Sequence, residues 1–147
     1  MRHLISCVVG MFVMSACAAQ PTSETLLSTN MVVVDEADVT VEQPPPHGEI
    51  GMSTAYRISD VAPQRNMEFR KRSLHLGAAI GEHVISHDEV YYVVSGKGVV
   101  ISDGEEAELT SGMAAYLYEG ANVGIKQVGD EPLVLIISYP LKSRKPL

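Results

Sequence analysis

Short apolar runs, many of them rich in valine, isoleucine and tyrosine, follow one another from about residue 55 to the end of the chain. Such runs, separated by turn residues, are typical of β-strands. No helical repeat is sustained beyond residue 17. The pattern predicts strands at 55–58, 69–76, 90–94, 99–102, 107–109, 114–118, 123–127 and 133–139.

The turns between these runs favour an antiparallel arrangement. Asp103-Gly104 and Gly129-Asp130 have the composition of hairpin turns. Many short antiparallel strands within about 90 residues predict a sandwich or a barrel, and closure removes exposed edges. Residues 133–137 are apolar at every position, so we expect this strand to be covered on both faces, by a second layer or by the partner in a homodimer.

The segment before this β-rich part has a different character. Residues 1–16 combine a charged start, a short apolar run and a small-residue end, which predicts a signal peptide for export. Residues 17–46 are expected to form a flexible tether, because they begin rich in Gln, Pro, Ser and Thr and end in a proline run. Short strands at 31–34 and 39–41 remain open within it. We place the barrel domain at 47–147.

The residues around Cys17 indicate how the exported protein is held. Met14-Ser15-Ala16-Cys17 resembles a bacterial lipobox, in which the cysteine receives a lipid before the leader is cleaved. We therefore expect a membrane-anchored lipoprotein, in the outer membrane of a Gram-negative host. Cleavage after Ala16 as an ordinary leader, giving a soluble periplasmic or secreted protein, is the alternative. The second cysteine, Cys7, lies in the leader, so disulfides and thiolate ligands are excluded from the exported domain.

Charge limits the partners further. The formal net charge of −7 argues against nucleic acid and against an anionic lipid surface, so the lipid anchor is the only membrane contact that we expect. Arg70-Lys71-Arg72 is an exception in this acidic chain. We interpret these three adjacent cations as a solvated strand edge, with an anion-binding patch as the alternative.

Two groups of residues resemble the signatures of the cupin superfamily. The first signature matches Gly77, His83, Glu89 and Gly96 in their spacing, and the second matches Gly112, Glu119 and Gly120. The resemblance covers residues 74–140. It implies an all-β fold, the double-stranded β-helix or jelly-roll barrel of the cupins, with a pocket inside the barrel.

The resemblance also implies a metal site, since many cupins hold a divalent transition metal with three imidazoles and one carboxylate. His83 and Glu89 match two of these ligands. Ile85 and Val123 stand where the other two imidazoles belong, and neither side chain can donate an electron pair. The ordinary metal site of the family therefore cannot form. Tyr118 replaces the usual proline of the second signature, at the lip of the pocket, where its hydroxyl could bind a ligand.

His87 offers a reduced metal set together with His83 and Glu89. On a straight strand His83 and His87 would be about 13 Å apart, so this set requires a turn near residues 85–86. A metal held by so few donors would be weakly bound. The alternative for His87 is a place at the barrel mouth, with a hydrogen bond to Asp88 or to the backbone.

Strand alternation predicts which side chains line the pocket, and we expect His75 to lie outside it. Glu89 and Tyr91 alternate along one strand and should face the barrel interior together. His75 could reach the same lumen, but a lone histidine is more often a satisfied core or surface residue. The expected pocket residues are His83, His87, Glu89, Tyr91 and Tyr118.

Three functions fit this sequence. The first is an exported cupin that binds a small organic ligand, a sugar or sugar acid, without metal chemistry. The second is a metal-dependent enzyme of the isomerase, lyase or dioxygenase type at His83, His87 and Glu89. The third is a structural or interaction lipoprotein whose barrel forms a homodimer. The fold does not choose between them, because function depends on the site.

Overall fold

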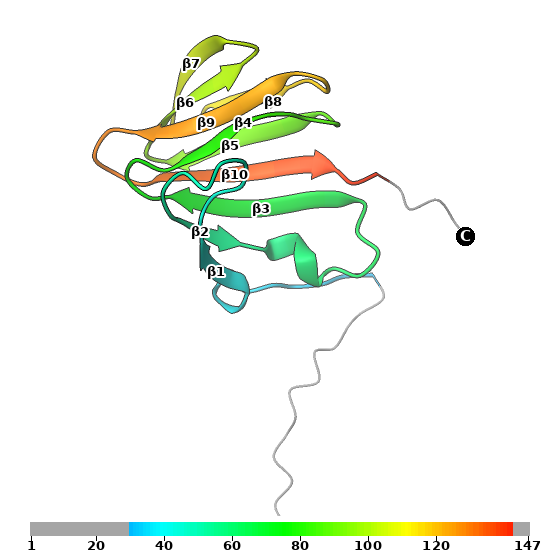
Figure 1. The fold of residues 1–147 in the computed structure, drawn as a ribbon. Coiled ribbons are helices and arrows are strands. Elements are labelled where there is room, and N and C mark those ends of the chain that lie inside the picture. Colours follow the sequence, from blue (N-terminus) through cyan, green and yellow to red (C-terminus); the bar gives the residue numbers. More distant parts are fainter. Residues whose placement is uncertain (1–29, 143–147) are drawn as a thin grey trace, which may run out of the picture.

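The computed structural model describes residues 30–142, which form two antiparallel β-sheets around one core (Figure 1). The larger sheet has the order β1 (Thr40–Gln43), β2 (Ser53–Tyr56), β3 (Met67–Leu74), β10 (Leu133–Pro140), β5 (Glu89–Ser95) and β8 (Ala114–Leu117). The smaller sheet has the order β4 (Ala79–Val84), β9 (Asn122–Val128), β6 (Lys97–Ser102) and β7 (Glu105–Thr110). Two short 3-10 helices, η1 (Glu36–Val39) and η2 (Ile58–Val61), lie next to β1 and β2. The predicted all-β jelly-roll barrel is confirmed.

The core lies between the sheets because buried and exposed side chains alternate along the strands. On β5, Tyr91 and Val93 are buried, whereas Tyr92 and Val94 are exposed. This alternation is expected of a sheet that packs one face on a core and turns the other to solvent. Along such a strand, every second side chain therefore points into the barrel interior.

The predicted strands from residue 55 onward are all present, with small shifts at their ends. The sequence pattern missed β4. This strand contains Gly81-Glu82-His83, which interrupts any apolar alternation, and its pairing with β9 shifts register between Ile80 and His83. Such a bulge breaks the two-residue period on which the prediction depended.

The barrel begins before residue 47, which corrects the expected boundary of the tether. β1 pairs with β2, and the Ser53 hydroxyl donates a hydrogen bond to the Gln43 carbonyl at 2.8 Å. Pro45 is fully buried. Residues 40–46 therefore belong to the fold. The sequence did not indicate this because the first three residues of β1 are exposed and carry no core pattern.

Residues 1–29 lie outside the described part of the chain, and the expected signal peptide and Cys17 lie there with them. Within residues 30–142, no helix is long and apolar enough to cross a membrane. Of the two short strands left open in the tether, the one at 39–41 is present as β1, and residues 31–34 form no strand.

The two turns predicted as hairpins have different outcomes. Asp103 and Gly104 have φ values of 49° and 85° and join β6 to its partner β7, so this hairpin is confirmed. Gly129-Asp130 joins β9 to β10, which belong to different sheets, so the hairpin prediction there is wrong. Turn composition shows that the chain reverses, but it does not show which sheet the next strand joins.

The apolar strand β10 lies inside the larger sheet, between β3 and β5. Its inward residues Leu135 and Ile137 are buried in the core, and its outward residues Val134 and Ile136 are half-buried. The core thus covers the inner face of this strand. That a second copy of the chain covers the outer face stays a prediction.

Candidate ligand pocket

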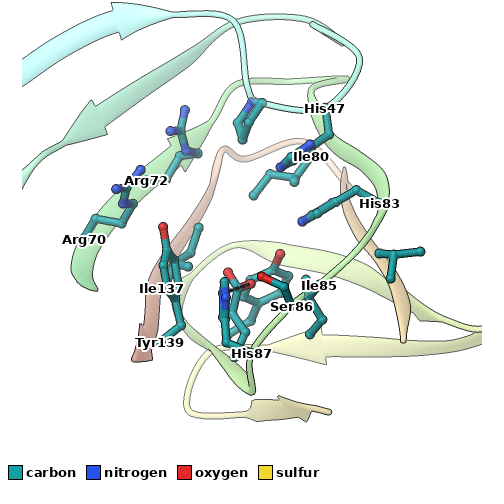
Figure 2. Close-up of a pocket in the computed structure, with 14 residues that line it drawn as sticks. His47, Arg70, Arg72, Ile80, His83, Ile85, Ser86, His87, Ile137 and Tyr139 are labelled. Carbon is teal, nitrogen blue, oxygen red and sulfur yellow. Dashed lines mark ion pairs between the residues drawn. The ribbon is translucent and has the colours of Figure 1, made fainter. Parts of the chain in front are cut away.

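A cavity of about 290 Å³ lies in the barrel interior (Figure 2). Its walls come from β3, β4, β5 and β10, the β4–β5 connection, and the segment between β1 and β2. A cavity of this size admits a small organic molecule and little more. The lining residues are Pro46, His47, Arg70, Arg72, Ile80, His83, Val84, Ile85, Ser86, His87, Glu89, Tyr91, Ile137 and Tyr139.

Two arginines enter this cavity from β3. Figure 2 shows Arg70 and Arg72 on the same side of the cavity, across from His83. Lys71 lies between them in sequence but belongs to the other face, where its ammonium stacks 4.0 Å from the ring centre of Tyr56. Since β3 is flanked by β2 and β10, the interpretation of this basic run as a solvated strand edge is wrong. Two of its three cations line a cavity.

Arg72 is a buried cation that forms no ion pair with the rest of residues 30–142. Its side chain is 2% exposed, one guanidinium nitrogen donates to the Ser53 hydroxyl at 2.7 Å, and the buried Nε has no hydrogen-bond partner. Burial, followed by the positive charge of Arg70, lowers the pKa of Arg72 to about 10, so the group is still charged at neutral pH. Arg70 differs, because a nitrogen of its guanidinium lies 2.8 Å from a carboxylate oxygen of Glu68.

Glu89 is a buried carboxyl that the described residues leave without a hydrogen bond. It is 6% exposed, as its alternation with Tyr91 predicted, and the His87 imidazole lies beside it, with Nε2 3.6 Å from a carboxyl oxygen. Burial raises the pKa of Glu89 to about 7, and the charge of Arg70 opposes that rise. Both the carboxylate and the neutral acid are therefore accessible near neutral pH.

His87 packs beside Glu89 on the pocket wall. Its ring stacks on Tyr139 with a centroid separation of 4.2 Å, and its buried Nε2 has no hydrogen-bond partner in the described part of the chain. The hydrogen bond from His87 to Asp88, which was the alternative to a ligand role, is not formed. The Asp88 carboxylate instead accepts hydrogen bonds from the Tyr116 hydroxyl and the Glu119 backbone amide. Burial, and then the charge of Lys142, lowers the pKa of His87, so its imidazole is neutral at neutral pH.

His83 faces the cavity from β4 in a defined tautomer. Its Nδ1 lies 3.0 Å from the Gly81 carbonyl, which can only accept, so Nδ1 carries the proton and Nε2 of the neutral ring has a free lone pair. The ring of His47 stacks on it, with centroids 3.5 Å apart and an interplanar angle of 9°.

His47 belongs to a segment that we call the strap, residues 44–50, which lies against the edge strand β4. Amides of β4 donate to the carbonyls of Pro46 at 3.4 Å and Ile50 at 3.1 Å. His47 and Glu49 have φ values of 60° and 52°, a conformation that costs energy for residues other than glycine. The strap thus forms one wall of the pocket at the expense of local backbone strain.

The structure brings four of the five expected pocket residues together: His83, His87, Glu89 and Tyr91. Tyr118 does not join them, since its side chain is 69% exposed and packs against Tyr116 outside the cavity. His75 also lies elsewhere, 3.0 Å from the Thr54 hydroxyl. The sequence analysis missed His47, Arg70, Arg72 and Tyr139 as lining residues. The basic run on β3 was the available signal for the two arginines.

The residues present do not fit the metal site that the fold family implies. The turn required between His83 and Glu89 exists, since β4 ends at Val84 and β5 begins at Glu89. Even so, residues 30–142 contain no group of three or more His, Cys, Asp or Glu side chains placed to hold an ion. Ile85 and Val123 are buried hydrocarbon at the remaining ligand positions. His83, His87 and Glu89 are therefore not placed to hold an ion together.

Comparisons with known proteins agree with this fold. A family model described as "Cupin domain" matches residues 72–139. A predicted oxalate decarboxylase from Thermotoga maritima aligns with a TM-score of 0.66 and 19% identity, covering 75% of this chain and 99% of that one.

Two further solved structures align over most of their length. An RmlC-like cupin from Shewanella frigidimarina has a TM-score of 0.56 and 20% identity, covering 70% of this chain and 85% of that one. A cupin 2 conserved barrel domain protein from Rhodopseudomonas palustris has a TM-score of 0.60 and 10% identity, with 74% and 76% covered. No curated protein matches in sequence. At these identities the solved structures show a shared cupin fold.

Proposed function

We propose that this cupin-fold protein binds a small organic acid in the barrel, with Arg72 as the anchor for the ligand carboxylate. The observation that carries the proposal is the buried, charged guanidinium of Arg72, which lines the cavity and pairs with no carboxylate among the described residues. A buried charge is costly unless it is paired. A ligand carboxylate would supply the missing charge and hydrogen-bond acceptor.

His83 and Glu89, elsewhere on the pocket wall, favour a ligand with a second polar group besides its carboxylate. His83 presents an acceptor nitrogen, which suits a ligand hydroxyl, and the buried carboxyl of Glu89 can accept or donate a hydrogen bond according to its protonation. A hydroxyl group next to the ligand carboxylate suits both side chains, and a carbonyl group there can accept a hydrogen bond from Glu89 when that carboxyl is protonated. We therefore propose that the ligand is a small oxo acid or hydroxy acid, a class that includes the small sugar acids expected from the sequence.

Titration calorimetry with matched ligand pairs tests this proposal. Pyruvate would be compared with pyruvamide, and gluconate with glucose, and we expect the protein to bind the acid of a pair and not its neutral counterpart. Arg72→Met should weaken binding of the acid roughly 10- to 100-fold, since hydrogen bonds to charged groups contribute about 1.5–3 kcal/mol. Lys71→Met is the matched control, because it removes the adjacent charge on the outer face.

Two results would contradict the proposal. Binding of the neutral compounds as tightly as the acids would show that charge does not select the ligand. An Arg72→Met variant that is folded by circular dichroism and binds the acids like the natural protein would show that the anchor lies elsewhere.

We also propose that the protein is exported and held at a membrane by a lipid on Cys17, on the strength of the leader-like residues 1–16 and the lipobox-like sequence before the cysteine. Cys17→Ser should move the protein from the membrane pellet to the soluble fraction after cell lysis. A variant that stays in the pellet, or a natural protein that is soluble with unmodified Cys17, would contradict the anchor. The second result would favour a soluble exported protein.

A further inference from the structure

We infer that Glu89 is a general base for a metal-independent proton transfer on the bound acid, so that the pocket catalyses enolisation of small 2-oxo acids. This inference rests on the proposed function, because the acid must first be held by Arg72. It assigns to the barrel an activity of its own in addition to binding.

Glu68, a second buried glutamate among the described residues, has a purely structural role and serves as a comparison for Glu89. Glu68 is 1% exposed, accepts from the Ser59 hydroxyl at 2.7 Å, and lies within ion-pair distance of Arg65 and Arg70. Hydrogen bonds and paired charge hold its pKa below the usual range, although burial opposes them. The Glu68 carboxylate is therefore held ionised by its hydrogen bond and ion pairs and is a poor proton acceptor.

Glu89 has none of these partners. It is nearly as buried, yet no described residue donates a hydrogen bond to it, and the imidazole of His87, 3.6 Å away, is neutral at neutral pH. Since Glu89 lines the cavity and accepts no hydrogen bond from a described residue, its carboxyl group is available to a ligand in that space. A buried carboxyl in a pocket, left without partners by the fold, is a candidate for acid–base work.

Arg72 supplies the electrostatic part of the step. The barrel lacks the imidazoles at positions 85 and 123 that would hold a metal cation, but it has a fixed guanidinium charge on the same cavity. A preorganised cation in a water-poor site stabilises the negative charge that develops when a carbonyl compound enolises. Arg72 and Glu89 line the same cavity of about 290 Å³, and the inference requires that a short acid anchored at Arg72 place its C3 at Glu89.

The step balances without an oxidant, a reductant or a metal. The Glu89 carboxylate takes a proton from C3 of the 2-oxo acid, and the electrons of the C3–H bond form a C2–C3 double bond. The carbonyl π electrons move onto the C2 oxygen, whose negative charge is stabilised by Arg72. The protonated Glu89 exchanges its proton with solvent, and return of this solvent-derived proton to C3 restores the C3–H bond, the carbonyl and the Glu89 carboxylate. The observable result is exchange of the C3 hydrogens with solvent.

Proton NMR in deuterium oxide tests the inference with pyruvate and 2-oxobutyrate as substrates. We expect the protein to accelerate loss of the C3 proton signals over a protein-free control, in the presence of EDTA as well as in its absence. Glu89→Gln should lower the protein-dependent rate by at least about 100-fold, the usual contribution of a positioned general base. The dissociation constant of pyruvate should change little, and exposed Glu105→Gln on β7 is the control with full activity.

A second variant keeps the test valid if Glu89→Gln does not fold. Glu89→Asp retains the base but withdraws it by one methylene, and it should leave exchange measurable and slower than in the natural protein. An undiminished rate in either folded variant overturns the inference, as does loss of exchange on chelation. Tight pyruvate binding without any exchange overturns the inference and leaves the proposed function standing. Failure of every acid to bind overturns both.

Discussion

Glu89→Gln is expected to stabilise the protein by about 3 kcal/mol at pH 8 and to have little effect on stability at pH 4. In the folded protein, burial raises the pKa of Glu89 from 4.5 to about 7. Below pH 4.5 the carboxyl is protonated in both the folded and the unfolded chain and behaves much like the amide. As the pH rises through 7, the folded protein must ionise a buried group, and this costs about 1.4 kcal/mol for each unit of pKa difference.

Urea denaturation of both proteins at pH values from 4 to 8 measures this effect, and the difference between them isolates Glu89 from the other titrating groups. Glu68→Gln is the matched control, because the pKa of this equally buried carboxyl is lowered and its ion pairs contribute stability that is present above the unfolded pKa. It should destabilise at pH 8. A difference between Glu89→Gln and the natural protein that stays constant from pH 4 to pH 8 would show that folding does not raise the pKa of Glu89.

Burial at Glu89 could be predicted from the sequence because the signal is local. Glu89, Tyr91 and Val93 alternate with exposed neighbours on one strand, and alternation is a property of the strand itself. The turn near residues 85–86 was predicted from the cupin resemblance, because His83 and His87 would be about 13 Å apart on a straight strand. Both predictions required no knowledge of which strands are neighbours.

Arg72 could not be assigned in the same way, because its role depends on the place of β3 in the sheet. On an edge strand three consecutive cations would be solvated, as we interpreted them. With β2 on one side and β10 on the other, alternation instead directs Arg70 and Arg72 to the interior and Lys71 to the outside. Strand order is set by pairing between distant segments, and the pattern within residues 70–72 contains no information about it.

The strap was missed for a related reason. Residues 44–50 are rich in proline and glycine, which is typical of a linker, and no periodic pattern marks them as part of a wall. Their place is determined by contacts with β4, above all by the close approach of the strap backbone to Gly81. A β-carbon built on Gly81 would lie 1.6 Å from the carbonyl oxygen of His47. The sequence shows the glycine but not the segment that requires it.

Gly81→Ala is therefore expected to displace the strap and open the pocket. The strap should move rather than β4, because β4 pairs with β9 on both sides of the bulge that contains Gly81. The strap has only two backbone hydrogen bonds to β4 and strained backbone angles at His47 and Glu49. Loss of these contacts and of the stack between His47 and His83 should cost about 2 kcal/mol of stability. Affinity for pyruvate should fall about tenfold, since 1.4 kcal/mol of lost contacts corresponds to that factor.

Hydrogen–deuterium exchange measured by mass spectrometry locates the change. Peptides covering residues 44–50 should exchange at least about tenfold faster in Gly81→Ala, while peptides covering β4 and β9 keep their protection. His47→Ala is the matched control, because it removes the ring stacked on His83 and leaves the backbone contact with Gly81 intact. It should weaken pyruvate binding less and leave strap exchange closer to that of the natural protein. Faster exchange in β4 with an unchanged strap would show that the strand yields to the added methyl group, and the strap would then be a fixed wall of the barrel.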